Sequence, residues 1–281
     1  MESQVKHIFH IGEEWVYYKL YCGKKTADDI LLDSILPFAE QLYSENTISK
    51  WFFIRYNDPD FHIRLRFKLK DVSQFAIVIQ ELHNVIQPFL DSGFIWDVQI
   101  HQYKREVERY GNHTIDFCES LFFWDSVNIL KSKQLHLSDE ESIVFLIRFI
   151  TLILDLFDFK TEDKFSFAER GRLGFKNEFN ANKTTIKQLD KKNRVIIDKY
   201  KTSKKDTFSN ILDDYQKQTT PVFKKIISSQ NKDFIINDLA HSIIHMTINR
   251  YFNSNQRLYE FLIYDVLYKL YKTQYFKSVK Q

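Results

Sequence analysis

Basic side chains recur on one face of a predicted strand at residues 61–69, whose sequence is FHIRLRFKL. Side chains alternate between the two faces of a strand, so one face is apolar throughout. The other face carries groups that are or can become cationic, namely His62, Arg64, Arg66 and Lys68. Arg64 and Arg66 would then lie about 7 Å apart on the same side, given a rise of about 3.3 Å per residue. A pair of guanidinium groups can hold a carboxylate through bidentate hydrogen bonds, which indicates an anion-binding surface.

Two later segments add basic residues to this surface: YKREVERYG at 103–111 and HSIIHMTINR at 241–250. We interpret the first as the opening of a helix on which Arg105 and Arg109 share a face at i, i+4 spacing. Taken alone, it is equally well explained as a salt-bridged surface helix. Arg55, on the preceding strand, joins the basic face or points away from it, depending on strand register. Three such segments in one chain favour a functional site, because clustered charge needs partners.

A polar stripe marks the helix predicted at 237–252, where His241, His245 and Asn249 recur at i, i+4 and i+8. Two histidines at this spacing can bind zinc, but the sequence has no HExxH motif and no clear third ligand, so we expect no metal site. Histidine is the side chain best suited to proton transfer near neutral pH. We therefore expect the stripe to face the basic strand, with His245 near the arginines. The alternative is a hydrogen-bonded core histidine.

Several classes of protein are disfavoured by motif and composition. The sequence contains no GxGxxG, GxxxxGK[ST] or GxSxG motif, so neither a nucleotide cofactor nor a serine nucleophile is expected, and we predict no cofactor. A net charge of +3 does not indicate a dedicated nucleic-acid binder. Cys22 and Cys118 are far apart and read as reduced thiols of a cytoplasmic protein. No signal peptide and no apolar stretch long enough to span a membrane is expected.

The elements that must position these residues divide the chain into two unlike halves. Residues 1–111 predict the order strand, helix, strand, strand, helix, strand, at 14–22, 26–42, 50–56, 61–69, 73–90 and 94–103. The turn Asn-Asp-Pro-Asp at 57–60 predicts that its two flanking strands form a hairpin. This βαββαβ order is the ferredoxin-like pattern, an antiparallel sheet with helices on one face.

Residues 112–281 carry helical periodicity almost throughout, and six Gly and four Pro in the whole chain also favour long helices. We predict helices at 114–133, 138–157, 161–172, 182–200, 205–229, 233–252 and 254–275. No Gly-, Pro- or Ser-rich linker separates the halves. The expected fold class is therefore α+β, with residues 1–281 forming one domain. In it the ferredoxin-like sheet packs against a mostly helical half, and the basic face lines a cleft between the halves.

Several long strings of the sequence occur in the order typical of one family. WFFIRYNDPDFHIRLRF, YKREVERYG, FCESLFFWDS and HSIIHMTINR resemble the C-terminal, glutamate-elimination domain of class I lanthipeptide dehydratases. The same domain occurs as a free-standing protein in thiopeptide-type bacteriocin clusters. The resemblance runs from Trp15 to the last helix and departs at Asn112, where the family often has a second glycine.

The resemblance implies a reaction and its partners. A separate enzyme, similar to the large N-terminal domain of those dehydratases, uses glutamyl-tRNA to esterify Ser or Thr of a precursor peptide. The elimination domain then removes glutamate and leaves dehydroalanine or dehydrobutyrine. This chain looks like a split elimination subunit that acts on the glutamylated peptide without needing tRNA itself. The resemblance leaves open whether the pathway makes a thiopeptide or a lanthipeptide, and whether a homodimer forms.

Carried onto this sequence, the catalytic residues of the family fall at Arg64, Arg66, Arg105 and His245. Arg109 lies one turn from Arg105 and is the alternative third arginine. The expected substrate-binding residues are Arg55, His62, Arg109, Asn249 and Arg250. Guanidinium groups suit the reaction because they stabilise developing negative charge without titrating. The sequence does not identify the group that removes the α-proton.

Two other functions fit parts of the sequence. A pyridine synthase of thiopeptide biosynthesis shares this fold and joins two dehydroalanines into a nitrogen ring, but it has less need for the carboxylate-binding set Arg64, Arg66 and Arg105. An RNA-recognition domain uses the same βαββαβ scaffold and stacks bases on exposed aromatic rings. Here the strand at 61–69 shows basic groups instead, and the RNP-type string is missing.

Overall fold

The computed structural model describes residues 5–203, 208–229 and 236–279. The first residues of the helices predicted at 205–229 and 233–252 lie outside these ranges. The chain forms two compact units. The first comprises Met1–Gln134, Ser228–Phe234 and Asn249–Ser254, and the second comprises Leu135–Ile227, Ile235–Ile248 and Asn255–Gln281. The predicted cleft would lie between a sheet half and a helical half, and it stays a prediction.

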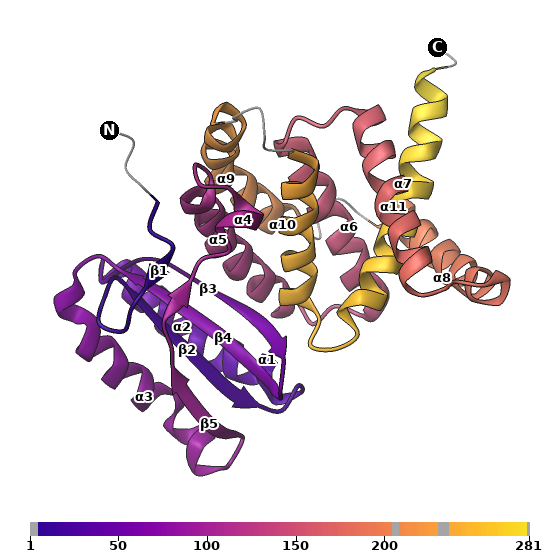
Figure 1. The fold of residues 1–281 in the computed structure, drawn as a ribbon. Helices are drawn as coiled ribbons and strands as arrows, with labels where there is room; N and C mark the ends of the chain where they lie inside the picture. The colour runs from indigo at the N-terminus through magenta and orange to yellow at the C-terminus, as the bar shows by residue number, and fades with distance from the viewer. Residues whose placement is uncertain (1–4, 204–207, 230–235, 280–281) are drawn as a thin grey trace. The chain divides into compact units, whose positions relative to one another are not determined.

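The first unit is built on a four-stranded antiparallel sheet (Figure 1). Its strands are β2 (Trp15–Cys22), β3 (Ile48–Asn57), β4 (Phe61–Leu69) and β5 (Ile95–Ile100), in the spatial order β3-β4-β2-β5. This order is that of a ferredoxin-like sheet and confirms the predicted fold class. The predicted hairpin is confirmed as well, because β3 and β4 pair from Asn57 and Phe61 onward.

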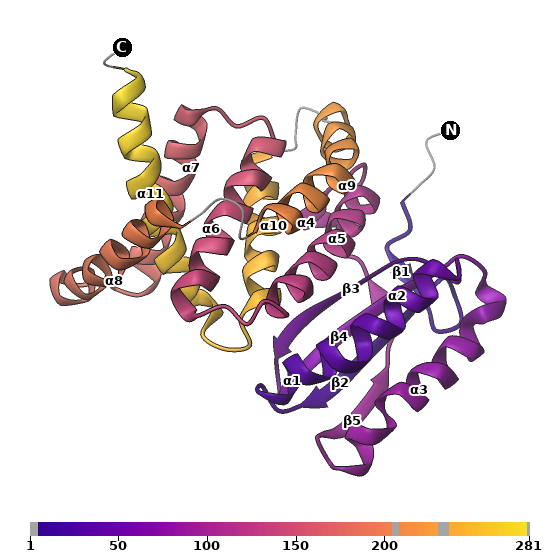
Figure 2. The same ribbon diagram turned by 180° about the vertical axis from the view of Figure 1, so that it is seen from behind.

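Two helical segments cover one face of this sheet (Figure 2). The first runs through α1 (Thr26–Asp29), the π-helical η1 (Ile30–Ile35) and α2 (Leu36–Ser44); the second follows the 3-10 turn η2 (Val72–Gln74) as α3 (Phe75–Asp91). The core between helices and sheet includes Leu31, Leu82 and, from the strands, Leu20, Trp51 and Leu65. The alternate residues of β4 from Phe61 to Leu69 all belong to this core, so the predicted phase of the strand is confirmed.

The predicted strand at 94–103 is wrong in its second part. β5 ends at Ile100, and Tyr103–Lys104 form a separate short strand, β6, which pairs with β1 (Ile8–Phe9). The rings of Phe9 and Tyr103 stack with their centroids 6.1 Å apart. Two-residue strands carry no detectable alternation, which is why the sequence did not reveal this second sheet.

The predicted helix carrying Arg105 and Arg109 on one face is also wrong. Helix α4 is a single turn, Val107–Tyr110, and Arg105 lies before it, directly after β6. The backbone N–H of Arg105 donates to the carbonyl of His7, which continues the pairing of the short sheet and holds Arg105 outside the helix.

Side chains from two segments seal the edge strand β3. From α5 (Ile115–Lys133), Ser126 accepts a hydrogen bond from the backbone N–H of Phe53 at 3.3 Å. The Asn249 side chain accepts from the backbone N–H of Arg55 and donates to its carbonyl, both at 2.9 Å, and Arg250 Nε donates to the carbonyl of Phe53. An open strand edge invites pairing with other chains, and these contacts close it. Helix α5 therefore belongs to the first unit, beyond the predicted change from sheet to helices at residue 111.

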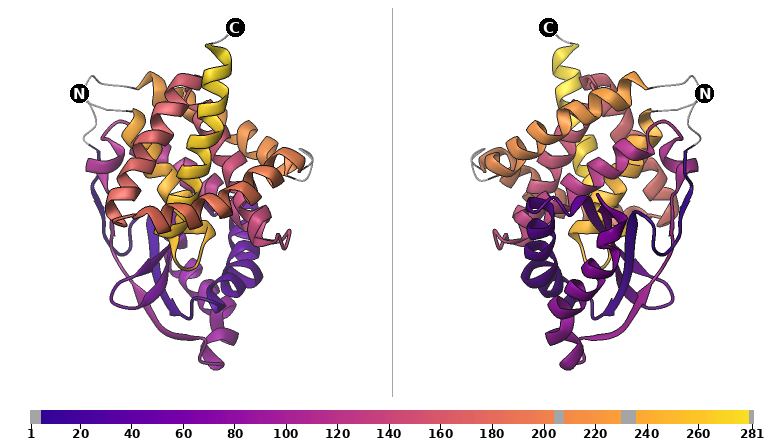
Figure 3. Two further views of the ribbon diagram at one scale, coloured as in Figure 1. Left: turned by 90° about the vertical axis from the view of Figure 1, so that its right-hand side faces the viewer. Right: turned by 90° about the vertical axis from the view of Figure 1, so that its left-hand side faces the viewer.

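The second unit is helical. Its helices are α6 (Asp139–Leu156), α7 (Thr161–Glu178), α8 (Lys183–Thr202), α9 (Ser209–Ser228), α10 (Ile236–Tyr251, of which the last turn belongs to the first unit) and α11 (Gln256–Ser278). These confirm the predicted helices, although α7 extends to Glu178 rather than 172. Helices α7 and α11 lie side by side (Figures 1 and 3). Gly171 permits this contact, since a Cβ there would lie 2.3 Å from the ring of Tyr264. No helix in the described ranges is long and apolar enough to cross a membrane.

Candidate active site

The second face of the sheet, opposite α1–α3, carries the basic residues of β4. Strand register places Tyr17, Lys19 and Tyr21 of β2 beside Arg66, Arg64 and His62 respectively. On the other side, Phe52, Ile54 and Tyr56 of β3 lie beside the same three residues, and Gln99 and Asp97 of β5 lie beyond Lys19 and Tyr21. This set is the basic face. It is less open than expected from the sequence, because the short β1–β6 sheet and the aromatic side chains bury part of it.

Arg66 is the most unusual residue of the basic face. Its side chain packs against three aromatic rings, with the guanidinium carbon 4.2 Å from the centroid of Tyr17, 4.9 Å from that of Tyr103 and 5.2 Å from that of Phe52. The residue is 7% exposed, and its Nε is buried without a hydrogen-bond partner in the described part of the chain. Cation–π contacts stabilise such a group, but a buried cation without a counter-charge is costly. An anion bound beside Arg66 would supply the missing counter-charge.

Arg64 is held in place by two neighbours. Its guanidinium stacks over the ring of Tyr56 at 3.4 Å, and its Nε donates to Nε2 of His62 at 3.1 Å. His62 Nδ1 donates in turn to the carbonyl of Asp60 at 2.9 Å, which fixes the neutral tautomer. Burial and the Arg64 charge lower the pKa of His62, although the Asp60 hydrogen bond opposes them. His62 is fully buried and positions Arg64, and its role in substrate binding stays a prediction.

Lys19 is a residue of the basic face that the sequence reasoning missed. It lies between Arg64 on β4 and Gln99 on β5 and is half-buried. Burial is the main cause that lowers the pKa of Lys19, and the charges of Arg64 and Arg66 lower it further. The sequence did contain a sign of this position: Lys19 is the only charged residue of the strand WVYYKLYC, and it alternates with the core residues of that strand.

Arg105 is paired in a way that the sequence did not show. Its Nε and one terminal nitrogen donate to the two carboxylate oxygens of Glu119, each at 2.7 Å, and the same terminal nitrogen donates to Asp116 at 2.6 Å. Arg105 and Glu119 are both buried. Glu119 also accepts from the hydroxyl of Tyr103, whose ring contacts Arg66. Arg105 therefore supports the aromatic wall of Arg66 as part of a buried ion pair, and its catalytic role stays a prediction.

Arg109 is the more accessible of the two arginines. It lies on α4 with a half-exposed side chain, and its ion pair with Glu106 is long, at 3.5 Å. Its side chain is therefore more exposed than that of Arg105, which is buried against Glu119.

Three predicted substrate-binding residues form hydrogen bonds or ion pairs within the fold, and their role in binding stays a prediction. Arg55 pairs in register with Ile63, which turns it to the face opposite Arg64, where it is buried and forms an ion pair with Asp28 at 2.5 Å. Arg250 forms a buried ion pair with Asp125 at 2.7 Å, and Asn249 closes the edge of β3. Strand register and the partners of α10 decide these positions, and neither is visible in the spacing of the sequence.

The two histidines of the predicted stripe belong to the second unit and have different surroundings. His245 Nδ1 lies 2.6 Å from Oε1 of Glu260, a buried carboxylate that also pairs with Arg257. A carboxylate on one ring nitrogen orients an imidazole for proton transfer from the other. His241 Nδ1 lies 2.8 Å from the Tyr264 hydroxyl, and its ring stacks on Phe167 at 3.8 Å. The predicted approach of His245 to the arginines involves both units and stays a prediction.

The sequence of the chain matches a known protein family. The sequence model described as "Lantibiotic biosynthesis dehydratase C-term" matches residues 15–271. The chain belongs to the lantibiotic dehydratase C-terminal family. It is 28% identical over 277 residues to the subtilin biosynthesis protein SpaB of Bacillus subtilis, which covers 94% of this chain and 26% of SpaB. The chain therefore spans about a quarter of the length of that relative.

Two solved structures share the fold of this dehydratase C-terminal domain. The tRNA-dependent lantibiotic dehydratase MibB from Microbispora sp. 107891 matches with a TM-score of 0.72 and 17% identity, over 96% of this chain and 29% of MibB. TbtD, a pyridine synthase from thiomuracin biosynthesis, matches with a TM-score of 0.56 and 11% identity, over 93% of this chain and 100% of TbtD. At these identities the matches establish the fold alone.

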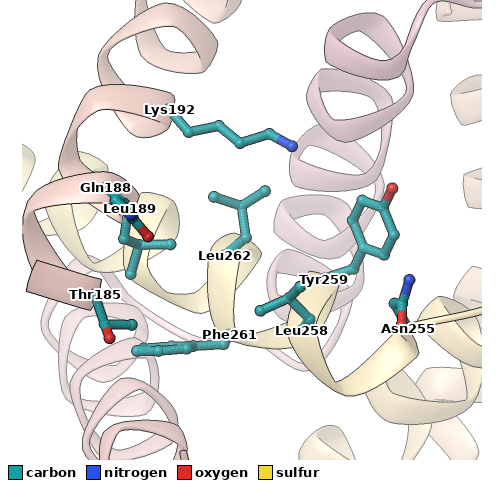
Figure 4. Close-up of a pocket in the computed structure, with 9 residues that line it drawn as sticks. All are labelled: Thr185, Gln188, Leu189, Lys192, Asn255, Leu258, Tyr259, Phe261 and Leu262. Carbon is teal, nitrogen blue, oxygen red and sulfur yellow. The ribbon is translucent and has the colours of Figure 1, made fainter. Parts of the chain in front are cut away.

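The dehydratase C-terminal domain also has a pocket in its second unit, between α8 and the first turns of α11 (Figure 4). Its volume is about 290 Å³, and its lining is mostly apolar, including Leu189, Leu258, Phe261 and Leu262. Lys192 is the one charged residue of the lining, which includes no carboxylate and no histidine. This composition suits the binding of an apolar group better than acid–base chemistry.

Proposed function

We propose that the chain eliminates glutamate from glutamylated Ser or Thr residues of a precursor peptide, leaving dehydroalanine or dehydrobutyrine. This lyase reaction would serve the biosynthesis of a lanthipeptide or a thiopeptide. The observation that carries the proposal is Arg66, a nearly buried guanidinium enclosed by three aromatic rings, for which the described residues provide no carboxylate. The partners required are the glutamylated peptide and an enzyme that forms the ester.

The chemistry of the elimination matches the charges of the basic face. The α-proton must leave, negative charge then develops on the peptide carbonyl, and glutamate departs as a carboxylate. Arg64 and Arg66 are held in fixed orientations and can stabilise this charge without reorganisation, which is the main source of electrostatic catalysis. Arg109 replaces Arg105 as the proposed third arginine, because Arg105 is already paired with Glu119. His245 remains a proposed proton-transfer residue.

Purified protein incubated with a glutamylated peptide tests this function. We expect release of free glutamate and, by mass spectrometry, loss of the glutamyl group together with water relative to the ester. Arg66→Ala should leave the ester intact, whereas Lys70→Ala, an exposed residue at the end of β4, should behave like the wild type. Hydrolysis to Ser without dehydroalanine would reject elimination. A peptide that already contains two dehydroalanines is the matched second substrate, and ring formation from it would favour the pyridine synthase instead.

A further inference from the structure

We propose, resting on the function above, that the amine of Lys19 is the base that removes the α-proton of the glutamylated residue. Strand register places Lys19 on the basic face between Arg64 and Gln99, two residues along β2 from Tyr17, the partner of Arg66. The base would thus stand beside the two groups that are proposed to receive the developing negative charge.

The surroundings of Lys19 destabilise its ammonium form and lower its pKa. The cations that face it are Arg64 and Arg66 on β4, and the carboxylate on β5, Asp97, accepts a hydrogen bond from Gln99 at 2.8 Å. No hydrogen bond or ion pair joins Lys19 to another described residue, and the residue is half-buried. Like charges and desolvation both destabilise an ammonium group. The pKa of Lys19 is therefore shifted in the direction that helps its amine to accept a proton.

Other groups of the basic face are poorly suited to accept the proton. Arginine does not titrate in proteins, so Arg64 and Arg66 cannot act as bases. Both ring nitrogens of His62 are engaged, one by Asp60 and one by Arg64. Asp97 lies at the far end of the row, beside Tyr21. Lys19 is the titratable group that lies next to Arg64 in the register.

The proposed step balances in protons and electrons. The Nζ lone pair of Lys19 takes the proton from Cα, and the electrons of the C–H bond form the Cα=Cβ double bond. The Cβ–O bond breaks, and glutamate leaves with that electron pair as a carboxylate. Lys19 becomes an ammonium beside Arg64, and the departing carboxylate supplies a counter-charge to both groups. Loss of the proton to solvent after glutamate departs regenerates the amine.

Replacement of the amine by a weaker base tests this role. Lys19→Cys should bind the glutamylated peptide with wild-type affinity and lose elimination by about 10²–10⁴-fold, the usual contribution of a general base. Alkylation with 2-bromoethylamine restores an amine at the same reach, made less basic by sulfur. We expect recovered elimination whose rate rises at lower pH than that of the wild type. Cys22 and Cys118 are fully buried, and alkylated wild-type protein is the control for their modification.

Lys19→Arg is the second variant, because it keeps the positive charge and removes the base. We expect it to fold like the wild type, by thermal melting, and to lose elimination. Full activity of Lys19→Arg, or an alkylated Lys19→Cys protein whose pH profile matches the wild type, would overturn the assignment and make Lys19 a binding group. Failure of the wild type to release glutamate would instead reject the proposed function itself, so the two failures are distinguishable.

Discussion

Arg66 and Arg105 show, at the scale of single residues, how differently one side-chain type is used. Both are buried, yet Arg105 pairs with two carboxylates, whereas Arg66 packs against aromatic rings and forms no ion pair with a described residue. The sequence presented both as arginines of basic segments. The distinction depends on Glu119, which lies 14 residues after Arg105 on α5 and reaches it only once that helix has packed against the sheet.

The two arginines of the segment YKREVERYG should respond oppositely to truncation. Arg105→Ala leaves Glu119 buried without its partner, so we expect a loss of about 3–5 kcal/mol in the free energy of unfolding. Arg109→Ala removes a half-exposed side chain, so its stability should be nearly unchanged while glutamate release falls. Urea unfolding and the elimination assay together check this. A stable Arg105→Ala protein that accumulates the ester would return the catalytic role to Arg105.

His241 should make stability depend on pH. Burial, and less so the charge of Arg170, lower its pKa to about 4 from an ordinary value of 6.5. The unfolded chain therefore binds this proton more readily, and stability present above pH 6.5 is lost as the pH falls toward 4. At about 1.4 kcal/mol for each pH unit between the two pKa values, the contribution to the free energy of unfolding is on the order of 3 kcal/mol. Unfolding free energies measured between pH 4 and 7 should fall less steeply in His241→Phe, and an unchanged slope would contradict the assignment.

At the scale of elements, the strand β4 was predicted in full because both its signals are local. Alternation fixed its phase, and the turn at 57–60 fixed its hairpin. Its core face joins the sheet to α1–α3, whereas its basic face holds the proposed site. Neighbouring residues of one strand should therefore separate stability from activity.

Leu65→Ala and Arg66→Ala test this separation. Leu65 is fully buried, so its truncation should cost about 2–5 kcal/mol through lost burial and the cavity left behind. Arg66→Ala should melt close to the wild type, because it removes a buried cation without an ion pair, and it should abolish elimination. Thermal melts and activity are measured on both variants. A large fall in the melting temperature of Arg66→Ala with a small one for Leu65→Ala would contradict the assignment of Leu65 to the core face and Arg66 to the basic face.

The elements that were missed depend on long-range contacts. Strand β6 exists because residues 103–104 meet 8–9 near the start of the chain, and α4 is short because Arg105 continues that pairing. The position of Arg55 follows from the register of β3 against β4, which a single strand cannot reveal. Lys19 was overlooked because one lysine in an apolar strand carries little statistical weight until its neighbours across the sheet are known.

At the scale of the whole molecule, the family match extends across both units, from residue 15 to residue 271. The alternation of βαββαβ followed by long helices made the fold class predictable. The division at Gln134 rather than residue 111 was not, because α5 resembles the later helices in sequence and differs only in what it packs against.

His245 is the residue through which the second unit should affect the reaction. Its imidazole is oriented by Glu260 and remains about one-third exposed. We expect His245→Ala to accumulate intact glutamylated peptide, with elimination reduced by about 10²–10⁴-fold and thermal stability retained. His241→Phe is the matched variant on the same helix and should keep its activity. Wild-type elimination by His245→Gln would show that the imidazole is not needed.

The seal on strand β3 bears on how the chain is made. Asn249 and Arg250 complete the edge of a sheet whose four strands all lie within the first 100 residues. During synthesis, the edge of the sheet is therefore completed only after residues 249 and 250 of the 281-residue chain have been made. Until then Asp125 lacks Arg250, and the carbonyl of Phe53 and the N–H and carbonyl of Arg55 lack the partners that Asn249 and Arg250 provide. A fragment ending at Gln134 would keep the βαββαβ pattern but would lack the contacts of Asn249 and Arg250 with the edge strand β3.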